Sequence, residues 1–147
     1  MNFNSGMEKL NPSSTYSSCA TILVIEDDVP IRDTIRWSLE AEGYSVLVAG
    51  DGKAGLDLLK QAKAPCLILL DLMLPIMNGW EFLAELRRQP STMLAAIPVL
   101  VTSAAGDRES ASAVRQAEGY MKKPIDLELL LKFVAKFCTG QSHSIES

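Results

Sequence analysis

Residues Cys66–Gly79, CLILLDLMLPIMNG, carry the clearest pattern of secondary structure in the chain. The first five of them are apolar without alternation, which is typical of a strand buried on both faces of a parallel sheet. Asp71 ends this run, and Asn78-Gly79 then opens a segment whose apolar residues recur at helical spacing. A buried strand that leads through an acidic residue into a helix indicates an α/β protein.

The same unit recurs on both sides of this stretch. Further apolar runs predict strands at Thr21–Ile25, Tyr44–Ala49, Ile97–Val101 and Tyr120–Lys123. Each is followed by a residue that can cap a helix, namely Asp28, Asp51, Asp107 and Asp126. Leu129, Leu130, Phe133 and Phe137 are expected on the inner face of the last helix. Five strands are too few for an eight-stranded barrel, so we expect a doubly wound five-stranded parallel sheet.

The remaining segments are short and polar. Residues 1–19 are rich in Ser and Asn and predict a flexible N-terminal arm, and residues 139–147 predict a flexible tail. One folded domain is therefore expected over residues 20–138. No output domain is expected after the fifth helix.

Composition excludes several classes of function. The chain has 147 residues, 48% of them hydrophobic, and a formal charge of −4, which argues against nonspecific binding of nucleic acid. No apolar run approaches the length of a membrane span. The single histidine, His143, lies in the polar tail, which removes histidine-based triads and zinc sites from the folded region.

Three cysteines lie far apart without a CxxC pair. This pattern predicts that Cys19, Cys66 and Cys138 are reduced thiols of a cytoplasmic protein, with Cys66 in the core.

Polar side chains follow or end several of the predicted strands. Glu26 and Asp27 follow the first strand, Asp71 the third and Thr102 the fourth, and Lys123 ends the fifth. The carboxyl ends of parallel strands meet at one edge of the sheet, so we expect these residues to converge there. Singly, each has an ordinary interpretation as a cap, turn or surface residue. Their joint placement favours chemistry.

Three carboxylates in one crevice repel one another, and a divalent cation relieves that repulsion. Mg²⁺ prefers such oxygen ligands together with water and a phosphate oxygen. A metal-bound carboxylate beside a lysine and a hydroxyl is a plausible phosphoryl acceptor, because Asp can form an aspartyl phosphate. We expect Asp71 to be this nucleophile, with Lys123 and Thr102 contacting phosphoryl oxygens.

The motifs ILVIEDD, LILLDLMLPIMNGWEF, IPVLVTSAA and GYMKKPID resemble the receiver domain of bacterial two-component response regulators over roughly residues 20–138. The resemblance implies a flavodoxin-like (βα)5 fold with strand order 2-1-3-4-5. It implies a phosphoacceptor at Asp71 and a Mg²⁺ site, and Lys123 matches the invariant lysine of the family's pattern. The implied metal ligands are Glu26, mostly through water, Asp27, Asp71 and the Met73 carbonyl. The implied switch residues are Thr102 and Tyr120, and Pro124 matches a proline that follows a cis peptide bond.

The resemblance also implies partners. A histidine kinase or a histidine phosphotransfer protein would donate the phosphoryl group in the cytoplasm. The fourth helix, fifth strand and fifth helix would then bind an unknown protein target, so we expect a stand-alone chemotaxis-type receiver. It would catalyse only its own phosphorylation and dephosphorylation, with no direct contact with nucleic acid.

Two local features are particular to this sequence. The segment Ala104–Glu118 is poor in large apolar residues, so a helix there has little to bury. Met73 and Ala104 follow Asp71 and Thr102 by two residues and cannot orient an attacking water, which predicts a long-lived phosphoryl group.

Three other functions are compatible with parts of this pattern. The first is a phosphate-independent interaction module on the same fold. The second is a phosphatase with an Asp nucleophile, which would need a second Asp where Met73 stands. The third is a flavin mononucleotide binder, whose phosphate would be repelled by the acidic loop at Glu26 and Asp27.

Overall fold

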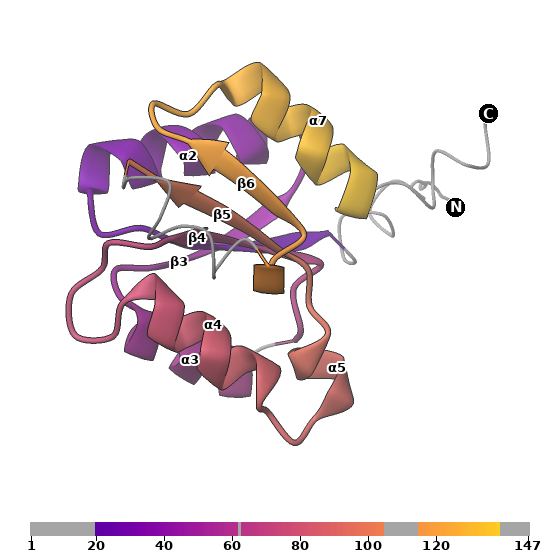
Figure 1. Ribbon diagram of the computed structural model, residues 1–147. Coiled ribbons are helices and arrows are strands. Elements are labelled where there is room, and N and C mark those ends of the chain that lie inside the picture. The colour runs from indigo at the N-terminus through magenta and orange to yellow at the C-terminus, as the bar shows by residue number, and fades with distance from the viewer. Residues whose placement is uncertain (1–19, 62, 105–114, 139–147) are drawn as a thin grey trace, which may run out of the picture.

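The computed structural model describes residues 20–61, 63–104 and 115–138 (Figure 1). Five strands form one sheet in the order β3-β2-β4-β5-β6, and every neighbouring pair is parallel. The strands are β2 (Thr21–Ile25), β3 (Ser45–Ala49), β4 (Leu67–Asp71), β5 (Val99–Ser103) and β6 (Gly119–Lys122). Because β2 is the first strand of the predicted set, this order is the expected 2-1-3-4-5. The predicted fold is confirmed.

Helices cover both faces of the sheet. They are α2 (Val29–Ala41), α3 (Gly52–Gln61), α4 (Gly79–Arg87), the single turn α5 (Thr92–Ala95) and α7 (Leu127–Cys138). Figure 1 shows α2 and α7 on one face, and α3, α4 and α5 on the other. Alternate residues of β2 divide between these layers: Ile22 and Val24 pack with α2 and α7, whereas Leu23 and Ile25 pack with α3 and α4.

The helices begin where the capping residues predicted them. Asp28 accepts a hydrogen bond from the Ile31 amide at 3.0 Å, and Asp51 accepts one from the Ala54 amide at 2.8 Å. Asn78 forms a capping box with Glu81 at the start of α4. Side-chain oxygens thus satisfy amides that have no partner within the helix.

Some boundaries differ from the prediction. The third strand is Leu67–Asp71 and the fourth is Val99–Ser103, so Asp71 and Thr102 lie inside their strands rather than beyond them. The short helix α5, capped by Ser91, was not predicted. The inward placement of Leu129 was wrong: it is 53% exposed, because Leu130 and Val134 occupy the inner face of α7.

Parts of the prediction fall outside the described residues. These are the two flexible ends at 1–19 and 139–147 and most of the fourth helix, which was expected at 108–117. Among the described residues, no helix is long and apolar enough to cross a membrane.

The prediction of reduced thiols was wrong for two cysteines, because Cys66 and Cys138 are joined by a disulfide. Their Cα atoms are 5.5 Å apart although 72 residues separate them in the chain. Cys66 immediately precedes β4, and Cys138 is the last residue of α7. The helix runs antiparallel to the strand, so its end meets the strand's beginning. Cys66 is partly buried and packs against the core, as predicted.

Candidate functional site

The carboxyl edge of the sheet gathers the polar residues that the sequence singled out. Glu26 and Asp27 directly follow β2, and Asp71 is the last residue of the central strand β4. In the register of β4 and β5, Asp71 lies opposite Thr102. Of these four residues, Glu26, Asp71 and Thr102 are nearly inaccessible, with exposures of 2%, 4% and 3%. The convergence expected from strand order is therefore present.

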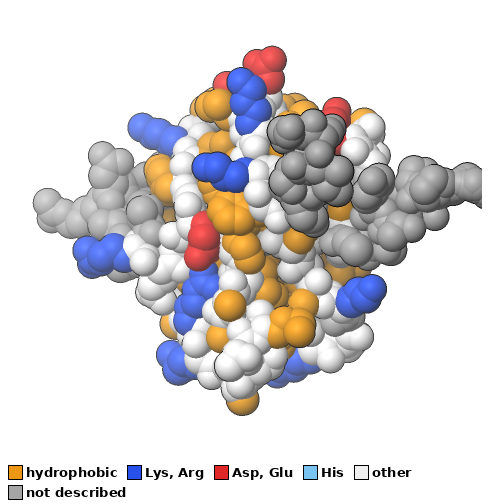
Figure 2. Space-filling model, turned by 90° about the vertical axis from the view of Figure 1, so that its right-hand side faces the viewer, with side chains coloured by type: hydrophobic (Ala, Val, Ile, Leu, Met, Phe, Trp, Pro, Cys, Tyr) orange, Lys and Arg blue, Asp and Glu red, His pale blue; other side chains and the backbone are white. Residues whose placement is uncertain are grey.

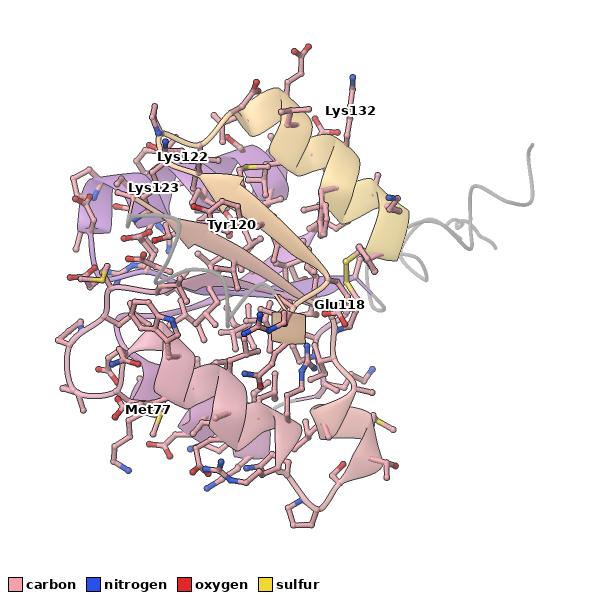
Figure 3. The ribbon with its side chains drawn as sticks, in the orientation of Figure 1. Met77, Glu118, Tyr120, Lys122, Lys123 and Lys132 are labelled. Atoms are coloured by element: carbon pink, nitrogen blue, oxygen red, sulfur yellow. A yellow bond between two sulfur atoms is a disulfide. The ribbon has the colours of Figure 1, made fainter. Side chains whose placement is uncertain are left out.

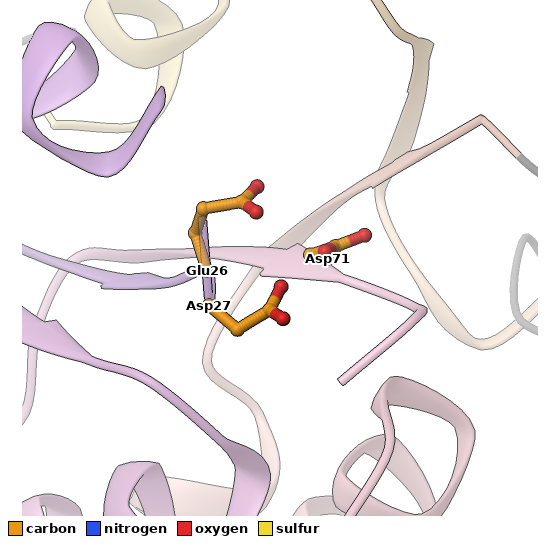
Figure 4. A group of neighbouring side chains, drawn as sticks. All are labelled: Glu26, Asp27 and Asp71. Carbon is orange, nitrogen blue, oxygen red and sulfur yellow. The ribbon is translucent and has the colours of Figure 1, made fainter. Parts of the chain in front are cut away.

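Three carboxylates form the acidic cluster of this edge, namely Glu26, Asp27 and Asp71 (Figure 4). One carboxylate oxygen from each lies within 4.8 Å of the others. Asp27 is exposed, whereas the other two are buried. The cluster thus has a buried inner side and one carboxylate open to solvent.

Lys123 closes the inner side of the acidic cluster. Its Nζ donates to Glu26 Oε1 at 2.9 Å and forms an ion pair with Asp71 Oδ2 at 3.3 Å. The neighbouring Lys122 is exposed and is the last residue of β6, so Lys123 follows the fifth strand instead of ending it as predicted. The peptide bond between Lys123 and Pro124 is cis, which confirms the expectation for this proline.

Burial and neighbouring charges shift the pKa values of Glu26 and Lys123. Burial raises the pKa of the Glu26 carboxyl, and the negative charge of Asp71 raises it further, against the lowering effect of the Lys123 hydrogen bond. Burial alone would lower the pKa of Lys123. The hydrogen bond to Glu26 and the charges of Asp71 and Glu26 outweigh that effect, so its pKa is raised. Lys123 is therefore held as a cation between two carboxylates.

The loop from Asp71 to α4 is packed tightly against the end of β4. A Cβ atom at Gly79 would lie 2.6 Å from the Asp71 carbonyl oxygen and from Leu72 Cα, so only glycine fits there. The Gly79 amide donates to the Leu72 carbonyl at 2.9 Å. Helix α4 thus begins directly against the backbone of the candidate nucleophile.

Met73 lies close to Asp71, and its backbone and side chain have different roles there. Its amide donates to Asp71 Oδ1 at 3.3 Å, while its side chain is 59% exposed. The apolar side chain therefore stands at the opening of the site. The predicted role of its carbonyl as a metal ligand stays a prediction.

Tyr120, on β6, lies opposite Val101, one residue before Thr102 (Figure 3). Its hydroxyl is buried and has no hydrogen-bond partner among the residues that the structure describes. A buried hydroxyl without a hydrogen-bond partner costs free energy, so this position of the ring leaves the hydroxyl unsatisfied. The side chain packs against the core cluster that lies under α3 and α4.

An apolar groove of about 280 Å³ opens beside Lys123. It is lined mainly by Pro30, Ile31 and Thr34 of α2 and by Pro124, Ile125 and Leu127. The groove therefore joins the start of α2 to the segment that follows Lys123. It offers a surface next to the buried carboxylates.

Sequence reasoning missed two arginines that join separate elements, Arg32 at the carboxyl edge of the sheet and Arg87 at the opposite edge. Arg32 Nη1 donates to the Glu26 carbonyl at 3.2 Å and so holds the acidic loop against α2. Arg87, at the end of α4, donates to the carbonyls of Ile97 at 2.8 Å and Gln116 at 2.8 Å. It also pairs with Glu118 at 3.1 Å, just before β6 (Figure 3). Helical spacing places neither arginine, because both reach across to other elements.

The residues at this edge fit a hard divalent cation. Oxygen ligands dominate, one carboxylate is open to solvent, and burial together with the charge of Asp71 raises the pKa of Glu26. These are features that Mg²⁺ would satisfy and relieve, with water completing its coordination. Glu26, Asp27 and Asp71 are the side chains that could hold it.

Comparisons with known proteins agree with this geometry. Residues 22–135 match the family described as the response regulator receiver domain. A probable transcriptional regulatory protein from Picosynechococcus sp. is 41% identical over 124 residues, which cover 78% of this chain and 47% of that protein. The chain thus spans about half the length of this relative and of other curated regulators that it matches.

Two further relatives are informative. An uncharacterized 14.6 kDa protein from Leptolyngbya boryana is 35% identical over 120 residues, covering 80% of this chain and 88% of that protein. The solved Mn²⁺-bound form of the response regulator Rcp1 is 29% identical, with a TM-score of 0.67. That match covers 78% of this chain and 88% of the solved chain.

Proposed function

The chain belongs to the response regulator receiver domain family, and on that premise we propose that it is a phosphorylatable switch with Asp71 as the phosphoacceptor. The observation that carries the proposal is the ion pair between Asp71 and Lys123 within the acidic cluster. This pairing holds the buried Asp71 carboxylate close to a cation. The nucleophile then needs no general base.

In the proposed reaction, Asp71 takes a phosphoryl group from a phosphohistidine. A carboxylate oxygen of Asp71 forms a bond to phosphorus as the bond from phosphorus to the histidine nitrogen breaks, and that nitrogen regains a proton. Lys123 would give up its present ion pair with Asp71 and move to pair with a phosphoryl oxygen. Bound Mg²⁺ would neutralise the other phosphoryl oxygens.

We propose that Thr102 and Tyr120 change position when Asp71 is phosphorylated. Thr102 lies opposite Asp71 in the sheet, so its hydroxyl can approach an oxygen of a phosphoryl group on Asp71. The buried hydroxyl of Tyr120 lacks a partner within the described part of the chain, so a different position of the ring can gain free energy. A small shift of Thr102 towards the phosphoryl group would change the packing around the ring. The switch is thus a shift between two populations, biased by one modification.

The phosphodonor is proposed to be a histidine kinase or a histidine phosphotransfer protein in the cytoplasm. Asp71 is only 4% exposed, so the donor has to fit closely around the opening of the site. The apolar groove beside Lys123 and the exposed Met73 side chain offer apolar contacts on either side of that opening. The proposed output surface comprises β6 and α7 together with the predicted fourth helix.

We propose that the receiver acts as a single domain through protein contacts. A curated relative of 14.6 kDa, matched over 88% of its length, supports a receiver of this size. Relatives that include the transcriptional regulator from Picosynechococcus sp. are about twice as long as the matched region.

The test is intact mass after incubation with Mg²⁺ and acetyl phosphate. We expect one phosphoryl adduct on the wild type, no adduct on Asp71→Asn, and none in the presence of a chelator. Asp57→Asn is the matched control, because Asp57 is an exposed aspartate on α3, away from the carboxyl edge. An adduct on Asp71→Asn would move the phosphoacceptor elsewhere. No adduct on any protein, even with a kinase, would favour the phosphate-independent module.

A further inference from the structure

The disulfide lies at the opposite edge of the sheet from the acidic cluster. Cys66 begins the run that ends at Asp71, and Cys138 ends α7, which starts four residues after Lys123. Figure 3 shows the sulfur–sulfur bond at the far end of α7 from Lys123. Figure 2 looks onto this side, where hydrophobic side chains form a band between lysines and arginines.

Together with the site, the disulfide closes a ring. The ring runs along β4 from Cys66 to Asp71, crosses the ion pair of 3.3 Å to Lys123, and returns through α7 to Cys138. The disulfide then joins Cys138 to Cys66. Helix α7 is thus held to the phosphoacceptor strand at both ends, by an ion pair at one and a covalent bond at the other.

We propose that the Cys66–Cys138 disulfide is a redox-sensitive restraint on the phosphorylation switch. When Asp71 is phosphorylated, Lys123 has to leave its present partners for a phosphoryl oxygen, which moves the start of α7. A closed disulfide fixes the other end of α7 and so opposes that movement. Reduction removes the restraint and favours the phosphorylated state. The inference rests on the proposed function of Asp71 for this consequence, but not for the ring itself.

The disulfide is placed for attack on one sulfur. Cys66 is partly exposed, whereas Cys138 is 2% exposed. A thiolate of a dithiol reductant would bond to the Cys66 sulfur, and Cys138 would leave as a thiolate and take up a proton. The second thiol of the reductant would then release Cys66 and form the reductant's own disulfide. The freed Cys66 thiol has an acceptor ready, the Thr21 carbonyl oxygen at 3.3 Å.

Reduction would loosen α7 without removing it from the sheet. Leu130, Val134 and Cys138 all belong to the core cluster under this helix, and each is at most 2% exposed. Apolar contacts therefore keep α7 in place when the covalent bond is gone. A restraint that can be lost without unfolding is what a regulatory disulfide requires.

The experiment uses the full chain carrying Cys19→Ser, so that only the Cys66–Cys138 pair responds. Oxidised and dithiothreitol-reduced samples are distinguished by alkylation and mass, then treated with Mg²⁺ and acetyl phosphate. We expect the ratio of phosphorylated to unphosphorylated protein to be at least threefold higher after reduction. Equal ratios in the two redox states would overturn the proposed coupling. Two alkylatable thiols that resist oxidation would overturn the disulfide itself.

A second arm does not depend on phosphorylation. Titration of the disulfide against dithiothreitol is compared between Lys123→Ala and the matched control Lys132→Ala, an exposed lysine of α7 (Figure 3). Breaking the ion pair opens the ring, so the Lys123→Ala disulfide should be at least threefold easier to reduce than in the control. Equal reduction of both variants would overturn the ring. If no sample is phosphorylated, the proposed function fails, while this arm still decides whether the ion pair and the disulfide are coupled through the ring.

Discussion

Replacing Ile76 by asparagine should stabilise the protein, because Ile76 has a backbone conformation that its side chain disfavours. Its φ angle is +65°, and it is a β-branched residue. Ile76 is the central residue of a turn in which the Met77 amide donates to the Pro75 carbonyl at 2.6 Å. The Met77 carbonyl also accepts a hydrogen bond from the Gly52 amide at 2.9 Å. The surrounding loop thus imposes this turn, whose positive central φ is the rare and strained form.

The magnitude follows from exposure and conformation. The Ile76 side chain is 79% exposed, so its removal forfeits little apolar burial. A non-glycine residue in the left-handed region costs about 1–2 kcal/mol, and asparagine tolerates that region better than isoleucine. We therefore expect Ile76→Asn to raise the free energy of unfolding by about 1 kcal/mol. Ile76→Gly should gain less, because glycine loses about 0.5–1 kcal/mol through backbone entropy.

The assay is urea denaturation of the oxidised protein, in which a gain of this size moves the midpoint by about 0.3–1 M. Ile76→Val is the matched control, because valine keeps the branched Cβ and hence the strain. Its stability should stay within about 0.5 kcal/mol of the wild type. If Ile76→Asn proves no more stable than Ile76→Val, the loop does not store strain at this residue.

Three further predictions concern the site itself. Gly79→Ala should destabilise the fold by about 1–3 kcal/mol and reduce phosphorylation, because the new Cβ would lie 2.6 Å from backbone atoms. Urea denaturation and intact mass measure the two effects. An unchanged variant would contradict the close packing of Gly79 on Asp71. Asp71→Asn should lower the pKa of Glu26, followed by carboxyl NMR, since the Asp71 charge helps to raise it. In the wild type, the folded pKa of Glu26 lies above its unfolded value, so its contribution to stability falls as pH rises from about 4.5. That fall should shrink in Asp71→Asn, and an equal fall in both proteins would refute the coupling. The phosphoryl group on Asp71 should be long-lived because Met73 and Ala104 cannot orient a water, and a half-life of seconds by intact mass would contradict this.

The carboxyl edge could be predicted from sequence because the reasoning needed only strand order. Parallel strands bring their ends to one edge, so Glu26, Asp71 and Thr102 had to meet once the five apolar runs were recognised. The exact ends of the strands were less certain. Asp71 and Thr102 lie inside β4 and β5, since each strand runs one or two residues further than its apolar stretch.

Contacts that cross between elements could not be predicted in this way. Arg32 reaches from α2 to the Glu26 carbonyl, and periodicity says only that an arginine on a helix is polar. The cysteine pair shows the same limit more sharply. Counting and spacing suggested isolated thiols, but an antiparallel helix and strand bring Cys66 and Cys138 together across 72 residues.

The position of Lys123 also refines what the acidic cluster can do. The resemblance to receiver domains implies that Glu26 contacts the metal mostly through water. In the structure, Lys123 already satisfies Glu26 at 2.9 Å, so a cation has to compete with the lysine for that carboxylate. Asp27, the exposed member, faces no such competition among the described residues. We therefore expect Asp27→Asn to weaken Mg²⁺ binding more than Glu26→Gln does, as measured by calorimetric titration. A larger loss in Glu26→Gln would mean that Lys123 gives way to the cation.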